Sequence, residues 1–346
     1  MNRTAAGVWW GGGLALGLSL LALAPLVSNP TPWENWPLTP AITLGLALVG
    51  ALYLRGARSE PVGRRAAFLG GLASLFLALQ SPLAAMAPHS FAFDALAQML
   101  LRTVAPALLI LAQPGVALRA GLTGYSVVTP RRFARLGGPV VATLVFVGTV
   151  YVWAWPAARN LTLVRPGARM LMDLTFLGSG LLFFRSLFDL RPEPDGPGIG
   201  TRLLMVWGAE LGNVVLGYYL TYISYPLYAG YAARGLLFGT SPLTNQMYGG
   251  QTWWLCDTAA IGLAAMTVIF RWARDEDRLR GRRHWLEDDP ATRRARQQAA
   301  NRKVALGLLG FVAMILGIIG ASVAVYEVGY HRAVRQAPTM SVNQIP

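Results

Sequence analysis

Apolar runs recur along the whole chain, and they set the strictest limit on its fold. Each run is about 18–25 residues long, and a helix rising 1.5 Å per residue then crosses about 30 Å of hydrocarbon. Hydrophobic residues make up 54% of the chain and charged residues only 13%, whereas a soluble domain carries about 25% charged residues. The sequence therefore predicts an all-α, polytopic bundle of transmembrane helices with lipid as its solvent.

Breaks at proline, glycine and charged residues divide the chain into about nine predicted spans. The spans lie near 7–28, 39–54, 66–86, 93–118, 138–156, 168–190, 202–223, 251–271 and 304–327. Four regions follow from them: an N-terminal span with its outer loop (1–38), a seven-helix membrane domain (39–275), a charged cytoplasmic arm (276–303), and a C-terminal span with an outer tail (304–346). We expect the arm to form a helical hairpin that breaks at Pro290 and faces lipid headgroups or docks a partner.

The net charge of +14 would favour nucleic-acid binding in a soluble chain. In this chain the basic residues lie mostly between apolar runs, where membrane topology and anionic lipid headgroups explain them, so no nucleic-acid partner is expected. Because arginines concentrate in alternate connections, the N-terminus is predicted to be cytoplasmic and the C-terminus periplasmic, in a bacterial inner membrane. The single cysteine, Cys256, excludes an internal disulfide and a cysteine-pair metal site.

Charged and polar residues inside the spans are the candidate site, because they are costly in hydrocarbon. The predicted outer cluster consists of Asp94, Gln98, Arg102, Arg169, Asp173 and Asp257. Asp94, Gln98 and Arg102 are spaced i, i+4, i+8, which places them on one helix face. Glu210 lies nearer the cytoplasmic side, one turn from Asn213.

Two interpretations fit these residues. In the structural one, which we favour, the cluster is an ion-pair network, and Arg102 lies within hydrogen-bonding reach of Asp94, Asp173 or Asp257. In the functional one, the residues form a proton or ion path. A path needs acids at several depths, whereas the sequence offers one outer cluster and a separate Glu210.

Metal binding is the remaining chemistry that the sequence raises. Met86, His89, Met99 and Met170 fall on the predicted outer side, and thioethers with imidazole suit Cu(I), although methionine is also ordinary core filler. We expect no bound metal or other cofactor. The sequence has no glycine-rich phosphate loop, no metalloprotease histidine motif and no histidine pair for haem, so an enzyme is not expected.

Residues 40–275 resemble the seven-helix, CtaG-like family of bacterial cytochrome c oxidase assembly factors. Five phrases occur in the same order: SPLAAM (81–86), AQMLLRTVAPALLILAQP (97–114), LTFLGSGLLFF (174–184), YPLYAGY (225–231), and SPLTNQMYGGQTWW (241–254) leading into RWARDEDR (271–278). The resemblance implies a role in maturing a copper-containing terminal oxidase, with outer-face histidines as metal ligands. Aligned with the family, those histidines fall at Asp94, Gln98, Arg169 and Asp173, and Asn245 replaces a family acid.

Replacing four imidazoles with carboxylates, an amide and a guanidinium turns a soft metal site into an ion-pair site. The predicted function is therefore a non-enzymatic membrane scaffold or accessory subunit that supports assembly or stability of a large respiratory or photosynthetic complex. Its expected partners are membrane lipid and other membrane-protein subunits. The alternatives are an active copper-handling assembly factor for cytochrome c oxidase and a transporter that uses Glu210 with the outer cluster.

Overall fold

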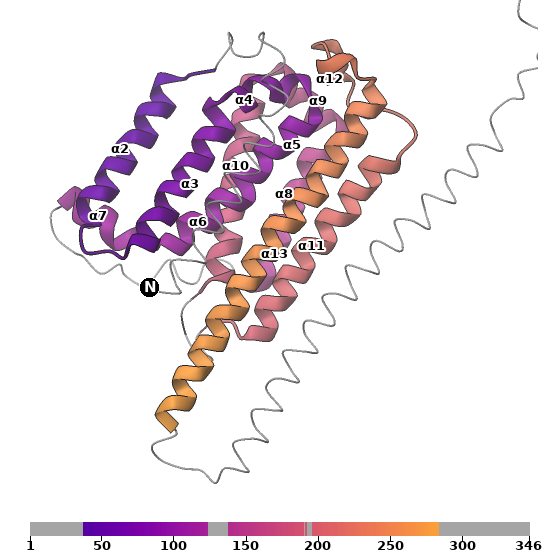
Figure 1. Ribbon diagram of the computed structural model, residues 1–346. Coiled ribbons are helices and arrows are strands. Elements are labelled where there is room, and N and C mark those ends of the chain that lie inside the picture. Colours follow the sequence, from indigo (N-terminus) through magenta and orange to yellow (C-terminus); the bar gives the residue numbers. More distant parts are fainter. Residues whose placement is uncertain (1–36, 124–137, 190, 192–195, 284–346) are drawn as a thin grey trace, which may run out of the picture. The chain divides into compact units, whose positions relative to one another are not determined.

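The computed structural model describes residues 37–123, 138–189, 191 and 196–283. The chain divides into two compact units, Met1–Trp272 and Ala273–Pro346, and the helical bundle belongs to the first. Every regular element among the described residues is a helix (Figure 1). The predicted all-α class is thus confirmed for this part of the chain.

The helices follow one another with short connections. They are α2 (Pro40–Gly56), α3 (Val62–Gln80), α4 (Pro82–Met86), the 3-10 turn η3 (Ala87–His89), α5 (Phe91–Met99), the π-helical turn η4 (Leu100–Val104), α6 (Ala105–Ala112), α7 (Gly115–Thr123), α8 (Pro139–Ala154), α9 (Pro156–Val164), α10 (Pro166–Leu187), α11 (Ile199–Tyr222), α12 (Ala229–Ala233), the 3-10 turn η6 (Leu237–Gly239) and α13 (Pro242–Arg283). Proline opens six of them, because its fixed φ suits the first helical turn and its missing N–H costs nothing there.

Five stretches of helix are long and apolar enough to cross a membrane, and α8 with α9 adds a sixth if this pair, bent by 72°, counts as one span. The five are Val62–His89, Phe91–Ala112, Pro166–Leu187, Ile199–Tyr222 and Pro242–Asp275. Helix α2 is apolar but only 17 residues long. The predicted spans 7–28 and 304–327 lie outside the described residues. The chain is a multi-pass membrane protein, but the count of nine spans is not confirmed.

The interior combines aromatic packing with close approach at glycines. Helix α8 packs against both α10 and α11, and α3 packs against α6 (Figure 1). The Phe146 and Phe183 rings stack with their centroids 4.3 Å apart. Between α11 and α13, a side chain at Gly217 would meet Trp254 Cβ at 2.6 Å, so the absence of a side chain lets these helices approach closely.

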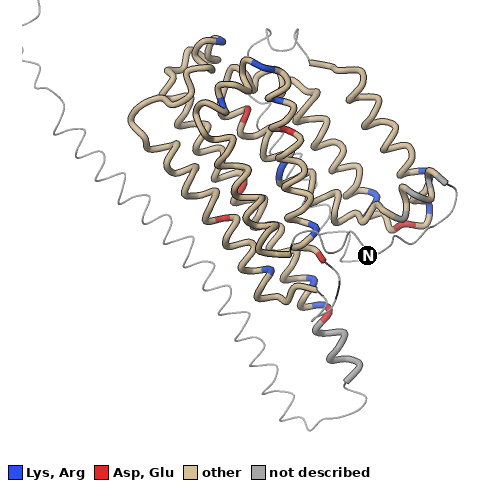
Figure 2. The backbone as a smooth tube through the Cα atoms, turned by 180° about the vertical axis from the view of Figure 1, so that it is seen from behind, with Lys and Arg blue, Asp and Glu red and all other residues tan. Residues whose placement is uncertain are grey.

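The outward faces of the helices carry large apolar side chains. Leu204 is 73% exposed, Val140 70% and Leu144 66%. Figure 2 shows long stretches of helix without a charged residue between the blue and red positions. Lipid tails cover such faces at no hydrophobic cost.

Of the predicted charged arm, only 276–283 is described, as the end of α13, so the hairpin predicted at Pro290 lies outside the described residues.

Candidate functional site

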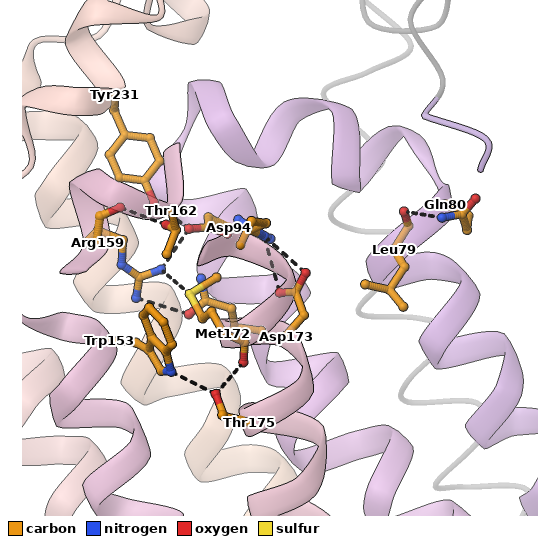
Figure 3. Close-up of polar contacts among 12 residues, drawn as sticks. Leu79, Gln80, Asp94, Trp153, Arg159, Thr162, Met172, Asp173, Thr175 and Tyr231 are labelled. Carbon is orange, nitrogen blue, oxygen red and sulfur yellow. Dashed lines mark hydrogen bonds and ion pairs between the residues drawn. The ribbon is translucent and has the colours of Figure 1, made fainter. Parts of the chain in front are cut away.

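Asp94, on α5, is fully buried and is the centre of a polar cluster (Figure 3). One of its carboxylate oxygens accepts hydrogen bonds from Arg159 on α9, at 2.9 Å, and from the Tyr231 hydroxyl on α12, at 2.5 Å. The other oxygen accepts a bond from Arg169 on α10 at 2.6 Å, and Arg169 also lies 3.3 Å from Asp173. These residues, called the Asp94 cluster, join four helical elements in one network.

Arg159 reaches Asp94 because the chain bends sharply after α8. Trp155 has an extended conformation (φ −59°, ψ 128°), which the following proline favours, and Pro156 then starts α9. The bend between the two helices is 72°. One face of α9 is buried, with Arg159, Thr162 and Leu163 on it. The bend at Trp155–Pro156 therefore directs α9 back toward the bundle, where Arg159 is buried.

The guanidinium of Arg159 is enclosed by aromatic rings. Its central carbon lies 5.2 Å from the Trp253 ring centroid, 5.3 Å from that of Phe91 and 5.9 Å from that of Tyr228. A guanidinium is attracted to aromatic faces at these distances. Arg159 also donates a hydrogen bond to the Gln98 side-chain oxygen at 3.2 Å. This fixed cation occupies the space between Asp94 and Gln98.

Tyr231 acts as a neutral hydrogen-bond donor to Asp94. Burial, together with the charge of Asp94 beside it, raises the pKa of Tyr231 well above its ordinary value of 10.0. Its hydroxyl therefore keeps its proton at physiological pH. Within the cluster, the carboxyl groups of Asp94 and Asp173 are matched by the guanidinium groups of Arg159 and Arg169. The cluster is thereby electrically balanced.

A second cluster lies about Asp257 on α13, and we call it the Asp257 cluster. Arg102 donates to the Asp257 carboxylate and, at 2.8 Å, to the side-chain oxygen of Asn213. Asn213 donates to the same carboxylate at 2.6 Å, and the Thr103 hydroxyl donates to its other oxygen at 2.5 Å. The guanidinium carbon of Arg102 lies 4.2 Å above the Phe146 ring. All four polar side chains are buried, so the pair is shielded from water.

A π-helical turn positions Arg102. Pro106 has no N–H to donate to the carbonyl of Arg102 four residues earlier, so the α-helical pattern cannot continue there. The chain forms η4 over Leu100–Val104 instead, a wide turn of the kind found at functional sites. Gly180 on α10 lies directly against the Arg102 carbonyl. The proline and the glycine together fix where the guanidinium points.

The predicted outer cluster is divided between these two networks. Asp94, Gln98, Arg169 and Asp173 come together around Arg159, whereas Arg102 and Asp257 belong to the other cluster. Arg102 contacts Asp257, one of the three partners expected for it. Asp94 and Arg102 are eight residues apart, about 12 Å along a helix axis, which is too far for one ion pair. Asn245, which is expected from the sequence to stand in place of a family acid, accepts a hydrogen bond from the Phe91 N–H at 3.0 Å.

Sequence reasoning missed Arg159 and Tyr231, and it placed Arg159 in an outer connection. One signal for Arg159 was available. Among the candidate residues within predicted spans there are four acids, Asp94, Asp173, Glu210 and Asp257, against the two arginines Arg102 and Arg169, so a further buried cation would reduce the excess of negative charge. Tyr231 lies on the short helix α12, between α11 and α13, and carries no charge that would have marked it in the sequence.

The copper candidates lie in different environments. Met170 is 63% exposed, Met86 is buried, and Met99 packs in an aliphatic core. His89 Nδ1 lies 3.0 Å from the carbonyl oxygen of Gly235. Among the described residues, no three His, Cys, Asp or Glu side chains gather as a metal-ligand group.

Comparison with known proteins identifies the chain's relatives. The model of the family described as cytochrome c oxidase caa3 assembly factor (Caa3_CtaG) matches residues 45–275. Uncharacterized proteins from Mycobacterium bovis and Mycobacterium tuberculosis are each 24% identical over 255 residues, which covers 70% of this chain and 39% of each relative. No solved structure matches the chain. Because the family model matches more than half of the sequence and includes both polar clusters, the chain belongs to the CtaG family of cytochrome c oxidase caa3 assembly factors.

Proposed function

We propose that this protein is a non-enzymatic scaffold or accessory subunit that supports the assembly or stability of a respiratory complex of the cytochrome oxidase type. It acts in a bacterial inner membrane, with its N-terminus cytoplasmic and its C-terminus periplasmic. Family membership supports a role in oxidase assembly. A photosynthetic complex, the other candidate suggested by the sequence, has no support from the relatives, and the proposal is confined to respiratory complexes.

One observation carries the proposal. Two of the residues expected in place of family histidines, Asp94 and Gln98, accept hydrogen bonds from the buried guanidinium of Arg159, and the other two, Arg169 and Asp173, form ion pairs in the same network. A guanidinium stays protonated at any physiological pH, so it places a permanent positive charge at the centre of the group. A metal cation at the same place would be repelled and would lose the carboxylate ligands that already bind arginine. The cluster is suited to holding helices together.

In the proposed scaffold, the ion pairs fix the arrangement of the helices. Helices α9, α10 and α12 are each bonded to Asp94 on α5, through Arg159, Arg169 and Tyr231 respectively. Lipid provides little driving force for helix association, so packing and polar contacts set the arrangement. A bundle fixed in this way presents constant outer faces, such as Leu204 and Leu211 on α11, to the helices of a partner.

The first prediction concerns copper. We expect the purified full chain to carry far less than one copper per molecule, even after incubation with Cu(I) and removal of excess metal. Elemental analysis measures this directly. Near one copper per chain, lost in Met99→Leu or in His89→Ala but kept in Met266→Leu on the exposed side of α13, would favour the alternative, an active copper-handling assembly factor.

The second prediction concerns the partner complex. Deleting the gene is expected to lower the abundance of the assembled terminal oxidase several-fold, and the tagged full chain, extracted in mild detergent, is expected to co-purify with its membrane subunits. Native mass measurement and subunit identification test both. The control is complementation by the unchanged chain. A protein that always isolates alone, and whose loss leaves every respiratory complex unchanged in amount and composition, cannot be the subunit proposed.

A further inference from the structure

Glu210 is a buried carboxyl group that neither polar cluster pairs with a cation. It lies on α11, one turn before Asn213, and is 3% exposed. Neither of its carboxyl oxygens has a hydrogen-bond partner among the described residues. An ionised carboxylate in this position would be costly, because burial without pairing removes the solvation of the charge.

The balance of charges in the described bundle singles out Glu210. Together, the two polar clusters and Glu210 contain four carboxyl groups and three guanidinium groups. The carboxyl groups are those of Asp94, Asp173, Glu210 and Asp257, and the guanidinium groups are those of Arg102, Arg159 and Arg169. Each acid except Glu210 contacts an arginine. Because arginine remains charged, one carboxyl group is in excess, and its protonation makes the set neutral.

Among the described residues, no neighbouring cation is available to form an ion pair with Glu210. The ionisable groups that act on it are Asp257 of α13, which repels an ionised carboxylate, and Arg102 of η4, which attracts it. Arg102 already donates to Asp257 and to Asn213, so its charge is engaged. On α13 the buried Thr258 hydroxyl faces Glu210, and that hydroxyl too has no hydrogen-bond partner among the described residues. This hydroxyl can accept a hydrogen bond from a protonated Glu210 or donate one to an ionised Glu210, so the excess of acids over cations, and not Thr258, favours the protonated form.

We propose that Glu210 is the proton-binding group of this bundle: it carries one proton at neutral pH, in a site formed with Arg102, Asp257 and Thr258. The ligand is a proton from water, which forms an O–H bond to the carboxyl group and leaves as H⁺ when the group ionises. Binding changes the charge of the site by one and needs no other reactant. The site is independent of the proposed role in assembly.

Infrared spectroscopy of the full chain in detergent tests the proposal. The C=O stretch of a protonated carboxylic acid is separate from the bands of ionised carboxylates. We expect one such carboxylic-acid band per chain at pH 7, present in the unchanged protein and lost in Glu210→Gln. Glutamine has the shape of the neutral acid, so this variant is expected to fold normally. The matched control, Asp173→Asn, removes a paired acid and is expected to keep the band.

The pH dependence of the melting temperature provides a second measurement. A group that binds its proton more tightly in the folded state stabilises the fold at low pH, and this contribution is lost as rising pH ionises the group. The apparent melting temperature of the unchanged protein is thus expected to fall as the pH rises from the ordinary pKa of a glutamic acid, about 4.3, through neutrality, and Glu210→Gln is expected to lose that part of the decline. Three results would each overturn the proposal. The carboxylic-acid band is absent at pH 7, or it is lost in Asp173→Asn instead of Glu210→Gln, or it appears only after Na⁺ is removed.

Discussion

Asp94→Asn is expected to lower the free energy of unfolding by about 3–5 kcal/mol, because removing one partner of a buried ion pair leaves an uncompensated charge. Asp94 contacts two guanidinium groups, and the first of them, Arg159, is 0% exposed. Asparagine has nearly the same volume as aspartate, so the loss comes from charge and not from a cavity. Denaturation of the detergent-solubilised protein, followed by circular dichroism, measures the change.

Two further variants isolate the cause. Arg159→Met together with Asp94→Asn removes a matched pair of charges, so the double change is expected to cost clearly less than the sum of the two single changes. The matched control is Asp189→Asn. Asp189 lies beyond the end of α10 and pairs with Arg191, whose side chain is 49% exposed, so about 0–1 kcal/mol is expected. Strictly additive effects at Asp94 and Arg159 would contradict the ion-pair description.

The sequence predicts helices well where proline or glycine marks their ends. The predicted spans 168–190 and 202–223 correspond to α10 (Pro166–Leu187) and α11 (Ile199–Tyr222) within three residues at each end. Pro166 and Gly198 mark where these two helices begin, and a largely apolar run fills each of them. Such boundaries depend on local backbone chemistry alone, which a single sequence contains.

Helix α13 shows where local signals mislead. Its predicted span starts at 251, whereas the helix begins at Pro242, because the intervening Asn, Gln and two Gly residues are typical of a loop. The structure explains these residues by distant partners. Asn245 accepts a hydrogen bond from the Phe91 N–H, and Gln246 accepts one from the Leu227 N–H at 2.6 Å. Tertiary contacts of this kind override the local preference, and no periodicity in the sequence reveals them.

The candidate site was predictable in its members but not in its pairing. The rule that charges in spans are costly selects Asp94, Arg102 and Asp257 correctly as interior residues. Which acid meets which base depends on how α8 and α9 bend at Trp155 and on the π-helical turn before Pro106. Both features arise from proline, but the direction in which they turn a side chain depends on packing between helices. The sequence could therefore not place Arg159 beside Asp94.

Gly180→Ala is expected to destabilise the protein by about 1–3 kcal/mol, the usual cost of overpacking a close-packed interior. A Cβ atom at Gly180 would lie 2.7 Å from Pro106 Cγ and 2.9 Å from the carbonyl carbon of Arg102, both closer than real Cβ contacts allow. The obstructing atoms belong to backbone and to a proline ring, which cannot rotate away. Helix α10 must then move off η4, and the same displacement shifts Arg102 relative to Asp257.

Gly178 supplies the matched control, because it lies two residues away on α10 and a Cβ atom there would meet nothing within 4 Å. In a helix interior, alanine is more favourable than glycine by about 0.5–1 kcal/mol, since glycine loses more backbone freedom on folding. Gly178→Ala is therefore expected to be neutral or stabilising, opposite in sign to Gly180→Ala. Thermal unfolding of both variants in the same detergent measures the difference. Equal effects at the two positions would mean that α10 does not rest on the turn that carries Arg102.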